Sequence, residues 1–205
     1  FLKEKISKNQ TLIIRSSVYP GIIERIKSIL ENKTNNIAYC PERILQGKAI
    51  EELPRLPQIV SGYNKNSIEV SKKLFKSITK KIIVTSILEA ELIKLFSNAW
   101  RYINFAASNQ FFMICQNLGV DFKKIRNLMM DGYSRNKSLP KAGFAAGPCL
   151  LKDTMQLSHF VNKKFPLGSE SLVINEGLPQ FFVNFLKKKY NLKRKKIGIL
   201  GLTFK

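Results

Sequence analysis

One uninterrupted stretch of this chain limits its fold more than any other. Residues 89–118 contain neither glycine nor proline, and as a helix this run of roughly 30 residues would be about 45 Å long. Its apolar residues recur at the spacing of one helix face, at Leu92, Leu95, Phe96, Ala99, Ile103 and Ala106. Gly119 is well placed to end this helix, and Asp121 to cap a shorter one over residues 122–130.

Strand and helix patterns alternate before this stretch. Short apolar runs typical of buried parallel strands occur at residues 11–18, 36–40, 56–62 and 81–85, and helical periodicity occurs at 22–30 and 67–78. The alternation predicts an α/β domain with a parallel sheet. After the long helix we expect helices near 150–162 and 169–190, the second bent at Gly177 and Pro179.

A last buried-strand pattern covers residues 196–202. A strand of a parallel sheet needs neighbours, and Phe1 is an unusual first residue, so we expect an internal piece of a longer protein. The predicted domains are residues 1–86, the end of an α/β domain; 87–192, a helical central domain; and 193–205, the first strand of a second α/β domain.

The chain is strongly basic, with 35 Lys and Arg against 14 Asp and Glu and a formal net charge of +21. Such an excess can indicate a protein that binds polyanions. Most of the basic residues are scattered as lysine pairs, however, and only residues 187–196 are dense. We therefore interpret them as a basic surface and expect no nucleic-acid partner. Nucleic-acid binding through residues 187–196 is the non-enzymatic alternative.

Cysteine and histidine are too sparse for most metal or triad chemistry. Cys40, Cys115 and Cys149 lack metal-site spacing, and His159 is the one histidine. We expect no metal site. The sequence contains no apolar run of about 18 residues, so we expect no membrane span. No apolar segment follows Phe1, so we expect no signal peptide. A reducing cytoplasm is the simplest compartment.

Cys149 has the neighbourhood of a reactive thiol. Small residues precede it, and Lys152 and Asp153 follow it. If Cys149 begins a helix, the helix N-terminus and Lys152 both favour a thiolate, and Asp153 lies one turn on. These residues form a plausible site for covalent catalysis. The alternative is a buried inert thiol, which is how we interpret Cys40 and Cys115.

Two further places have the polar residues of a binding site. Lys94 and Asn98 lie one helical turn apart and could stabilise a developing oxyanion, although a solvated polar face has the same spacing. Glu42 follows the strand pattern at 36–40, and open α/β sheets bind ligands beyond such strand ends. This makes Glu42 a candidate general base and the backbone of 43–47 a candidate substrate contact, with a structural proline turn as the alternative.

Five segments, in order, resemble the motifs of the UDP-glucose/GDP-mannose dehydrogenase family, NAD-dependent enzymes that oxidise nucleotide sugars to uronic acids. They are Ser16-Ser17-Val18-Tyr19-Pro20-Gly21, Pro41-Glu42-Arg43-Ile44-Leu45-Gln46-Gly47, Ala90-Glu91-Leu92-Ile93-Lys94-Leu95-Phe96-Ser97-Asn98-Ala99, Gly147-Pro148-Cys149-Leu150-Leu151-Lys152-Asp153 and Gly201-Leu202-Thr203-Phe204-Lys205. Ser17 stands where the family has threonine, and Ala146 where it has glycine. The family's Gly-x-Gly-x-x-Gly fingerprint is absent from this sequence.

The resemblance implies the end of a Rossmann-like parallel-sheet domain, then an all-helical central domain, then the first strand of a second, UDP-sugar-binding Rossmann-like domain. It implies NAD as cofactor, a nucleotide-sugar substrate, a place in polysaccharide precursor synthesis and a homodimer through the long helix 89–118. Because the dinucleotide fingerprint is missing, we expect the fragment to be inactive alone.

The resemblance also implies residue roles. Cys149 would attack the aldehyde left by a first oxidation, and a second oxidation would give a thioester that water hydrolyses. Lys94 and Asn98 would stabilise oxyanions, Asp153 would position water, and Glu42 would act as a base. Ser17, Glu42 and Lys152 would lie near NAD. The implied substrate contacts are Arg43, Ile44, Leu45, Lys94, Asn98, Gly147 and Lys205.

The Cys-Pro-Glu-Arg form of residues 40–43 is similar to the branch of the family that acts on UDP-N-acetylhexosamines, notably UDP-N-acetylmannosamine. The enzymatic alternative is a dehydrogenase of the β-hydroxyacid or 6-phosphogluconate group, which also uses a Lys-x-x-x-Asn helix. That group makes a single hydride transfer and needs no nucleophilic cysteine.

Overall fold

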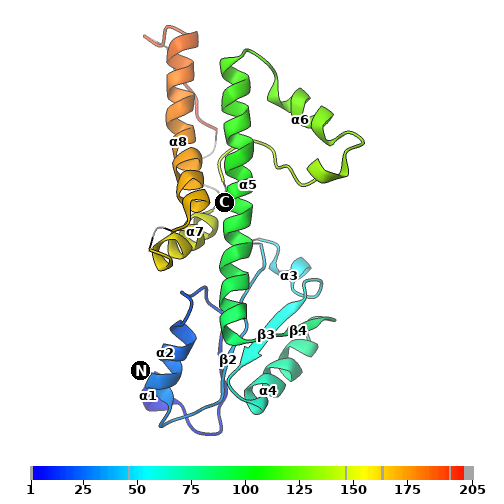
Figure 1. The fold of residues 1–205 in the computed structure, drawn as a ribbon, viewed down its shortest axis with the longest axis vertical. Helices are drawn as coiled ribbons and strands as arrows, with labels where there is room; N and C mark the ends of the chain where they lie inside the picture. Colours follow the sequence, from blue (N-terminus) through cyan, green and yellow to red (C-terminus); the bar gives the residue numbers. More distant parts are fainter. Residues whose placement is uncertain (1, 46, 146, 163, 194, 201–205) are drawn as a thin grey trace. The chain divides into compact units, whose positions relative to one another are not determined.

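The computed structural model describes residues 2–45, 47–145, 147–162, 164–193 and 195–200. The chain divides into two compact units, residues 1–97 and 98–205. In Figure 1 the first unit contains a small sheet with helices packed on it, and the described part of the second is helical.

The first unit alternates strands and helices, as the sequence predicts. Its elements are α1 (Leu2–Lys5), β1 (Leu12–Ile14), α2 (Ile22–Leu30), β2 (Ile37–Tyr39), α3 (Ala49–Glu52), β3 (Gln58–Gly62), α4 (Lys65–Lys76), β4 (Ile82–Val84) and the start of α5 (Ile87–Asn117). Each strand lies inside one of the four predicted apolar runs, and α2 has the predicted bounds.

The four strands form one sheet in the order β1-β2-β3-β4. β1 pairs in parallel with β2, and β3 in parallel with β4. The central pair departs from the expected parallel arrangement, because β2 and β3 are antiparallel, with Ala38 opposite Gly62. The connection between them contains only α3, which is 4 residues long. Parallel strands are usually joined by a crossover helix that packs on the sheet, and the 4-residue α3 is only about one turn long.

Two apolar clusters, one on each face of β2, form the core of this unit. The first consists of Ile23, Leu30, Ile37, Tyr39, Ile59 and Ala90. The second consists of Ala38, Cys40, Val60 and Phe75. Successive side chains of a strand point to opposite faces, so both faces of β2 are buried. This explains why the strand is a continuous apolar run rather than an alternating one.

The second unit is helical among its described residues, as expected. It contains the rest of α5, followed by α6 (Phe122–Met130), the 3-10 helix η1 (Ser134–Asn136), α7 (Pro148–Phe160) and α8 (Pro166–Lys189). Helix α5 is 31 residues long, and Gly119 follows it with a φ of 70°, which suits glycine. Asp121 caps α6 by accepting the Lys123 N–H at 2.8 Å. The predictions of the long helix and of α6 are confirmed.

The described residues 195–200 form neither helix nor strand, and Ile197, Ile199 and Leu200 are exposed. The strand expected over 196–202 is therefore not formed at residues 196–200, and positions 201–202 lie outside the described residues. Of the positions that resemble the family's motifs, Gln46 and all of 201–205, Lys205 included, lie outside the described residues, as does Ala146.

Candidate active site

Cys149 lies in the first turn of α7, which is the placement that the thiolate hypothesis requires. Gly147 precedes the helix with a φ of 86°, a backbone conformation that favours glycine, and Pro148 takes the first helical position. Proline fits there because a first-turn N–H has no partner inside the helix. The thiol is exposed and lies at the positive end of the helix dipole, so a substrate can reach the sulfur.

Asp153 follows one turn later on α7 and is completely buried. Its Oδ2 accepts a hydrogen bond from Asn98 Nδ2 of α5 at 2.6 Å, and Lys152 Nζ lies 3.5 Å from Oδ1. Burying a carboxylate without such partners would be strongly unfavourable. The fold therefore joins two predicted catalytic residues that are 55 positions apart. An amide NH₂ has two N–H groups, and the bond to Asp153 uses one.

Lys94 is half-buried on α5, one helical turn before Asn98. An ammonium and an amide at this spacing can approach one oxygen atom. The continuous helix of α5 thus confirms the spacing on which the oxyanion hypothesis depends, and the catalytic role itself stays a prediction.

Ser17 and Glu42 lie beyond the carboxyl ends of the neighbouring parallel strands β1 and β2. The Cys40 N–H bonds to the Ile14 carbonyl at 2.9 Å, and the Glu42 N–H to the Arg15 carbonyl at 3.3 Å. The segments after β1 and β2 therefore run side by side beyond the ends of the strands. This is the edge where open α/β sheets bind ligands, so the placement of the two predicted cofactor contacts suits a dinucleotide.

The Glu42 carboxylate holds the turn that follows β2. Its Oε1 accepts the backbone N–H groups of Arg43 at 2.7 Å and Ile44 at 2.9 Å, and its Oε2 pairs with the Arg15 guanidinium. The Arg15 guanidinium also lies over the Phe75 ring, 4.9 Å from its centroid. Glu42 thus has the structural role that the sequence left open as an alternative. Its side chain remains 39% exposed, so a substrate contact is compatible with that role.

The other predicted substrate contacts near Glu42 are ordered within the first unit. The Arg43 guanidinium donates to the Pro57 carbonyl, and the Leu45 N–H donates to Glu52 Oε2 at 2.7 Å. Ile44 is half-buried. Hydrogen bonds from Arg43 and Leu45 therefore hold residues 43–45 in a turn.

The two cysteines interpreted as inert are buried, in contrast to Cys149. Burial raises the pKa of the Cys40 thiol. His159 is exposed on α7, as expected for a surface histidine.

Glu91 is a buried carboxylate that the sequence analysis does not single out. It is 1% exposed, and its oxygens accept the N–H groups of Gly21 at 2.7 Å and Ile23 at 3.1 Å. These groups form the N-terminus of α2, which is therefore occupied by a side chain and cannot serve as a phosphate site. The available signal was a glutamate on the same helix face as Leu95.

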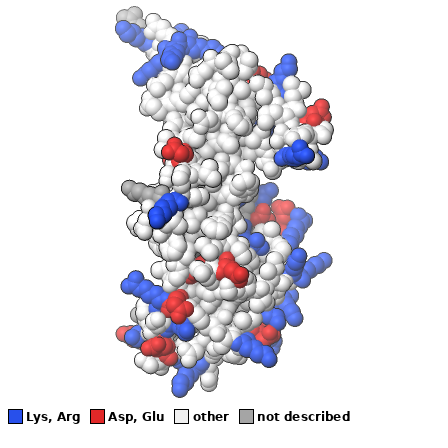
Figure 2. Space-filling view, viewed as in Figure 1, with Lys and Arg blue, Asp and Glu red and all other residues white. Residues whose placement is uncertain are grey.

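Basic residues are spread over the surface rather than gathered on one stripe. Figure 2 shows them scattered over the visible face, with one group at the C-terminal end of α8, where Lys187, Lys188 and Lys189 lie. In the first unit several form ion pairs at helical spacing: Lys27–Glu24, Arg55–Glu51 and Lys72–Glu69. This pattern fits a basic surface, and nucleic-acid binding at 187–196 stays untested.

In the part of the chain that the structure describes, no three His, Cys, Asp or Glu side chains are grouped so that they could hold a metal ion. Across the described ranges, none of the helices combines the length and the apolar character needed to cross a bilayer.

The fold and the site define a class of protein with an α/β domain followed by helices that carry an exposed thiol. Residues 1–79 match the model of the UDP-glucose/GDP-mannose dehydrogenase family's NAD binding domain, and residues 88–176 match that of its central domain. Together the two matches cover most of the chain. The chain belongs to the UDP-glucose/GDP-mannose dehydrogenase family.

Relatives and solved structures agree with this assignment. The chain is 32% identical to the UDP-N-acetyl-D-mannosamine dehydrogenase of Methanococcus vannielii, over 98% of this chain and 47% of the relative. It is 30% identical to the UDP-glucose 6-dehydrogenase of Rickettsia bellii, over 98% and 49%. The structure of UDP-D-ManNAc dehydrogenase from Pyrococcus horikoshii superposes with a TM-score of 0.84 at 27% identity, over 94% and 47%. The chain thus spans about half the length of these relatives.

Proposed function

We propose that the complete protein is an NAD-dependent dehydrogenase that oxidises C6 of a UDP-hexose or UDP-N-acetylhexosamine to the uronic acid, a four-electron oxidation that supplies precursors of polysaccharides. One observation carries the proposal: an exposed Cys149 begins α7, and the bonded Asn98–Asp153 pair lies one turn behind it. The names of the Methanococcus and Pyrococcus relatives support N-acetylmannosamine as the sugar.

The need for two oxidations at one carbon explains Cys149. An aldehyde carbon lacks the tetrahedral alkoxide from which a second hydride can leave, and addition of a thiolate supplies one. Cys149 Sγ forms a bond to the carbonyl carbon, and the carbonyl oxygen becomes the alkoxide. Loss of hydride then leaves a thioester. Water cleaves the carbon–sulfur bond, which releases the carboxylate and returns a proton to the sulfur.

NAD, when bound, accepts the hydride of each oxidation. The residues of this chain that fit the cofactor lie at the carboxyl edge of β1 and β2, where Ser17 and Glu42 follow adjacent parallel strands. Lys152 is the corresponding candidate in the second unit, and it is exposed on α7. The sequence contains no Gly-x-Gly-x-x-Gly, so phosphate binding through that motif is not assigned to these residues.

Oxyanion stabilisation is assigned to α5. Lys94 supplies an ammonium, and Asn98 supplies the amide N–H that is not bonded to Asp153. Because Asp153 is buried against Asn98, its first task is to orient that amide. Its second is to position the hydrolytic water. Glu42 is assigned separately as a base for thioester hydrolysis.

A homodimer along α5 is part of the proposal. Among the exposed large apolar side chains of this helix, four share one face and are 41–65% exposed, namely Phe96, Trp100, Phe111 and Ile114. Their separations of 4, 11 and 3 residues place them on one face of the helix. An apolar stripe of this kind on a helix is typical of a helix–helix interface. We also assign the protein to the cytoplasm, where the three free cysteines stay reduced.

The test is the Cys149→Ser substitution in the complete protein. With UDP-N-acetylmannosamine and UDP-glucose as substrates, the wild type should form the uronic acid with two NADH per sugar. The variant should lose acid formation by a factor on the order of 10³ or more, because no thioester forms. Cys115→Ser, at a buried cysteine of the same unit, is the matched control. Unchanged turnover in Cys149→Ser would contradict the proposal and favour a dehydrogenase that makes a single hydride transfer.

A further inference from the structure

Helix α5 also holds the segment that leads to Cys149, through polar side chains that the proposed chemistry does not use. Ser108 and Asn109 are adjacent on α5 and completely buried. Ser108 Oγ donates to the Pro140 carbonyl at 2.8 Å, and Asn109 Oδ1 accepts the Gly143 N–H at 2.8 Å. Two neighbouring side chains thus bind two points of one irregular segment.

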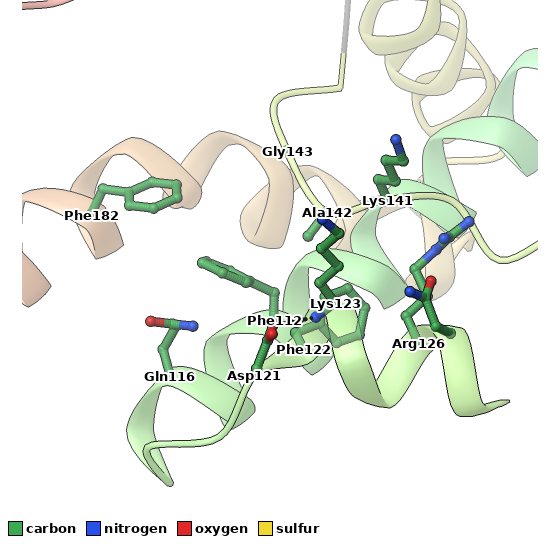
Figure 3. Close-up of a pocket in the computed structure, with 11 residues that line it drawn as sticks. Phe112, Gln116, Asp121, Phe122, Lys123, Arg126, Lys141, Ala142, Gly143 and Phe182 are labelled. Atoms are coloured by element: carbon green, nitrogen blue, oxygen red, sulfur yellow. Dashed lines mark hydrogen bonds between the residues drawn. The ribbon is translucent and has the colours of Figure 1, made fainter.

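A third side chain binds the same segment from α6. Arg126 Nη2 donates to the Leu139 carbonyl at 2.6 Å, and its Nε lies 3.0 Å from the carbonyls of both Leu139 and Pro140. In Figure 3 the backbone through Lys141, Ala142 and Gly143 passes over the helices that carry Phe112 and Arg126. An irregular segment has few backbone partners of its own, so these side chains supply its hydrogen bonds.

The contact at Gly143 is continued into α8 by a chain of amides. Asn109 Nδ2 donates to Asn175 Oδ1 at 2.8 Å, and Asn175 Nδ2 donates to the Tyr102 carbonyl at 3.0 Å. Asn175 is 3% exposed. The two buried asparagines therefore form a relay between the backbone of α5 and the part-buried backbone of the segment before Cys149.

The ends of the relay fix its direction. The Tyr102 carbonyl can only accept a hydrogen bond, and the Gly143 N–H can only donate one. Reversing either amide would place two donors or two acceptors face to face at both of its contacts. The orientation of each asparagine therefore follows from its partners, although the oxygen and nitrogen of an amide have nearly the same shape.

We infer that Asn109, oriented by Asn175, is a positioning residue for the substrate-binding segment before the nucleophilic cysteine. Gly143 has a φ of 154°, a backbone conformation that side-chain-bearing residues rarely adopt, and the relay bonds to its N–H. Four residues later Gly147 begins the turn into Cys149. Fixing Gly143 sets where the backbone of this segment meets the nucleotide sugar. The expected effect on kinetics rests on the proposed function. The expected effect on the backbone of the segment rests on the hydrogen bonds alone.

The test is Asn109→Leu in the complete protein, with Asn104→Leu as the matched control. Asn104 lies on the same helix, and its side chain donates to the Trp100 carbonyl of that helix. Leucine at 109 leaves both the Gly143 N–H and Asn175 Oδ1 without this partner. Displacing a positioned segment by about 1 Å can cost on the order of 10²-fold in rate. We expect kcat/KM for the nucleotide sugar to fall roughly 10- to 100-fold through a higher KM, with the KM for NAD unchanged.

Hydrogen exchange gives a readout that does not require activity. The backbone amide of Gly143 should exchange at least about 10-fold faster in Asn109→Leu than in the wild type and in Asn104→Leu, because its protecting bond is lost. Unchanged exchange in a folded Asn109→Leu protein would overturn the inference, even if activity fell. If the wild type oxidised no nucleotide sugar but the exchange result held, the proposed function would fail and the positioning role would stand.

A second variant keeps the inference testable if Asn109→Leu does not fold. Asn175→Ala removes the acceptor that orients Asn109 and leaves the Asn109 side chain in place. Faster exchange at Gly143, with the exchange of α6 unchanged, would support the relay. Exchange at Gly143 equal to that of the wild type would show that Asn109 holds the segment without Asn175, and the relay would be rejected.

Discussion

The substitution Glu91→Gln tests whether a buried side chain of α5 holds the start of α2. Each carboxylate oxygen of Glu91 accepts one backbone N–H, from Gly21 and from Ile23. Glutamine has almost the same shape and keeps one acceptor. Its NH₂ group must then face the other N–H, so one of the two hydrogen bonds is lost and the second becomes neutral.

The expected loss of stability can be worked from these two contacts. A hydrogen bond to a charged group contributes about 1.5–3 kcal/mol, a neutral one about 0.5–1.5 kcal/mol, and a buried donor left without a partner costs about 1–3 kcal/mol. The charge also interacts favourably with the N-terminus of α2. Relief of the desolvation of a buried carboxylate acts in the opposite direction. The net expectation is a decrease of about 3 kcal/mol in the free energy of unfolding.

Urea titration of the complete protein measures this decrease by linear extrapolation. Glu31→Gln is the matched control, because exposed Glu31 lies at the C-terminal end of α2. There the same loss of charge removes an unfavourable interaction with the helix dipole, so stability should be unchanged or slightly higher. If Glu91→Gln lowered the stability by less than about 0.5 kcal/mol, or if both variants shifted it in the same direction by similar amounts, the reasoning would be refuted.

Three further predictions concern other local features. Asn64→Ala removes the acceptor of the Ser67 N–H in the capping box of α4, and should lower the free energy of unfolding by about 1 kcal/mol, whereas Asn66→Ala inside the helix should not. The pKa of Glu89 is lowered to about 2 because the Thr85 hydroxyl and the Ser86 N–H and hydroxyl donate to its carboxylate. The contribution of ionised Glu89 to the stability of the fold is therefore complete above the unfolded pKa of 4.5 and is lost as the pH falls through about 2. Ser86→Ala should raise that pKa in an NMR titration, and no change would contradict the assigned cause. Trp100→Asp, on the exposed stripe of α5, should convert a homodimer into a monomer in analytical ultracentrifugation, while Val173→Asp, at an exposed apolar residue of α8, should not.

Local signals predicted much of this fold. The bounds of α2 and α6 were predicted to the residue, because apolar periodicity and a capping residue act within a few positions. The start of α7 at Pro148 lies two residues before the start expected near residue 150, and it places Cys149 in the first turn. The antiparallel pairing of β2 with β3 was not predicted, because it depends on where a segment without a crossover helix re-enters the sheet.

The candidate site divides in the same way. The sequence by itself determined the chemical groups and their local spacing: the thiol at a helix start, the carboxylate four residues on, and the Lys94–Asn98 pair on one helix. Only the tertiary structure decided which groups bond to one another. Asn98 meets Asp153 across 55 positions, Asn109 meets Asn175 across 66, and Glu91 meets Gly21 across 70. Each contact depends on how α5 packs against other elements. Packing is set by the summed burial of many side chains. A pattern along one segment therefore contains no information on that segment's distant partner.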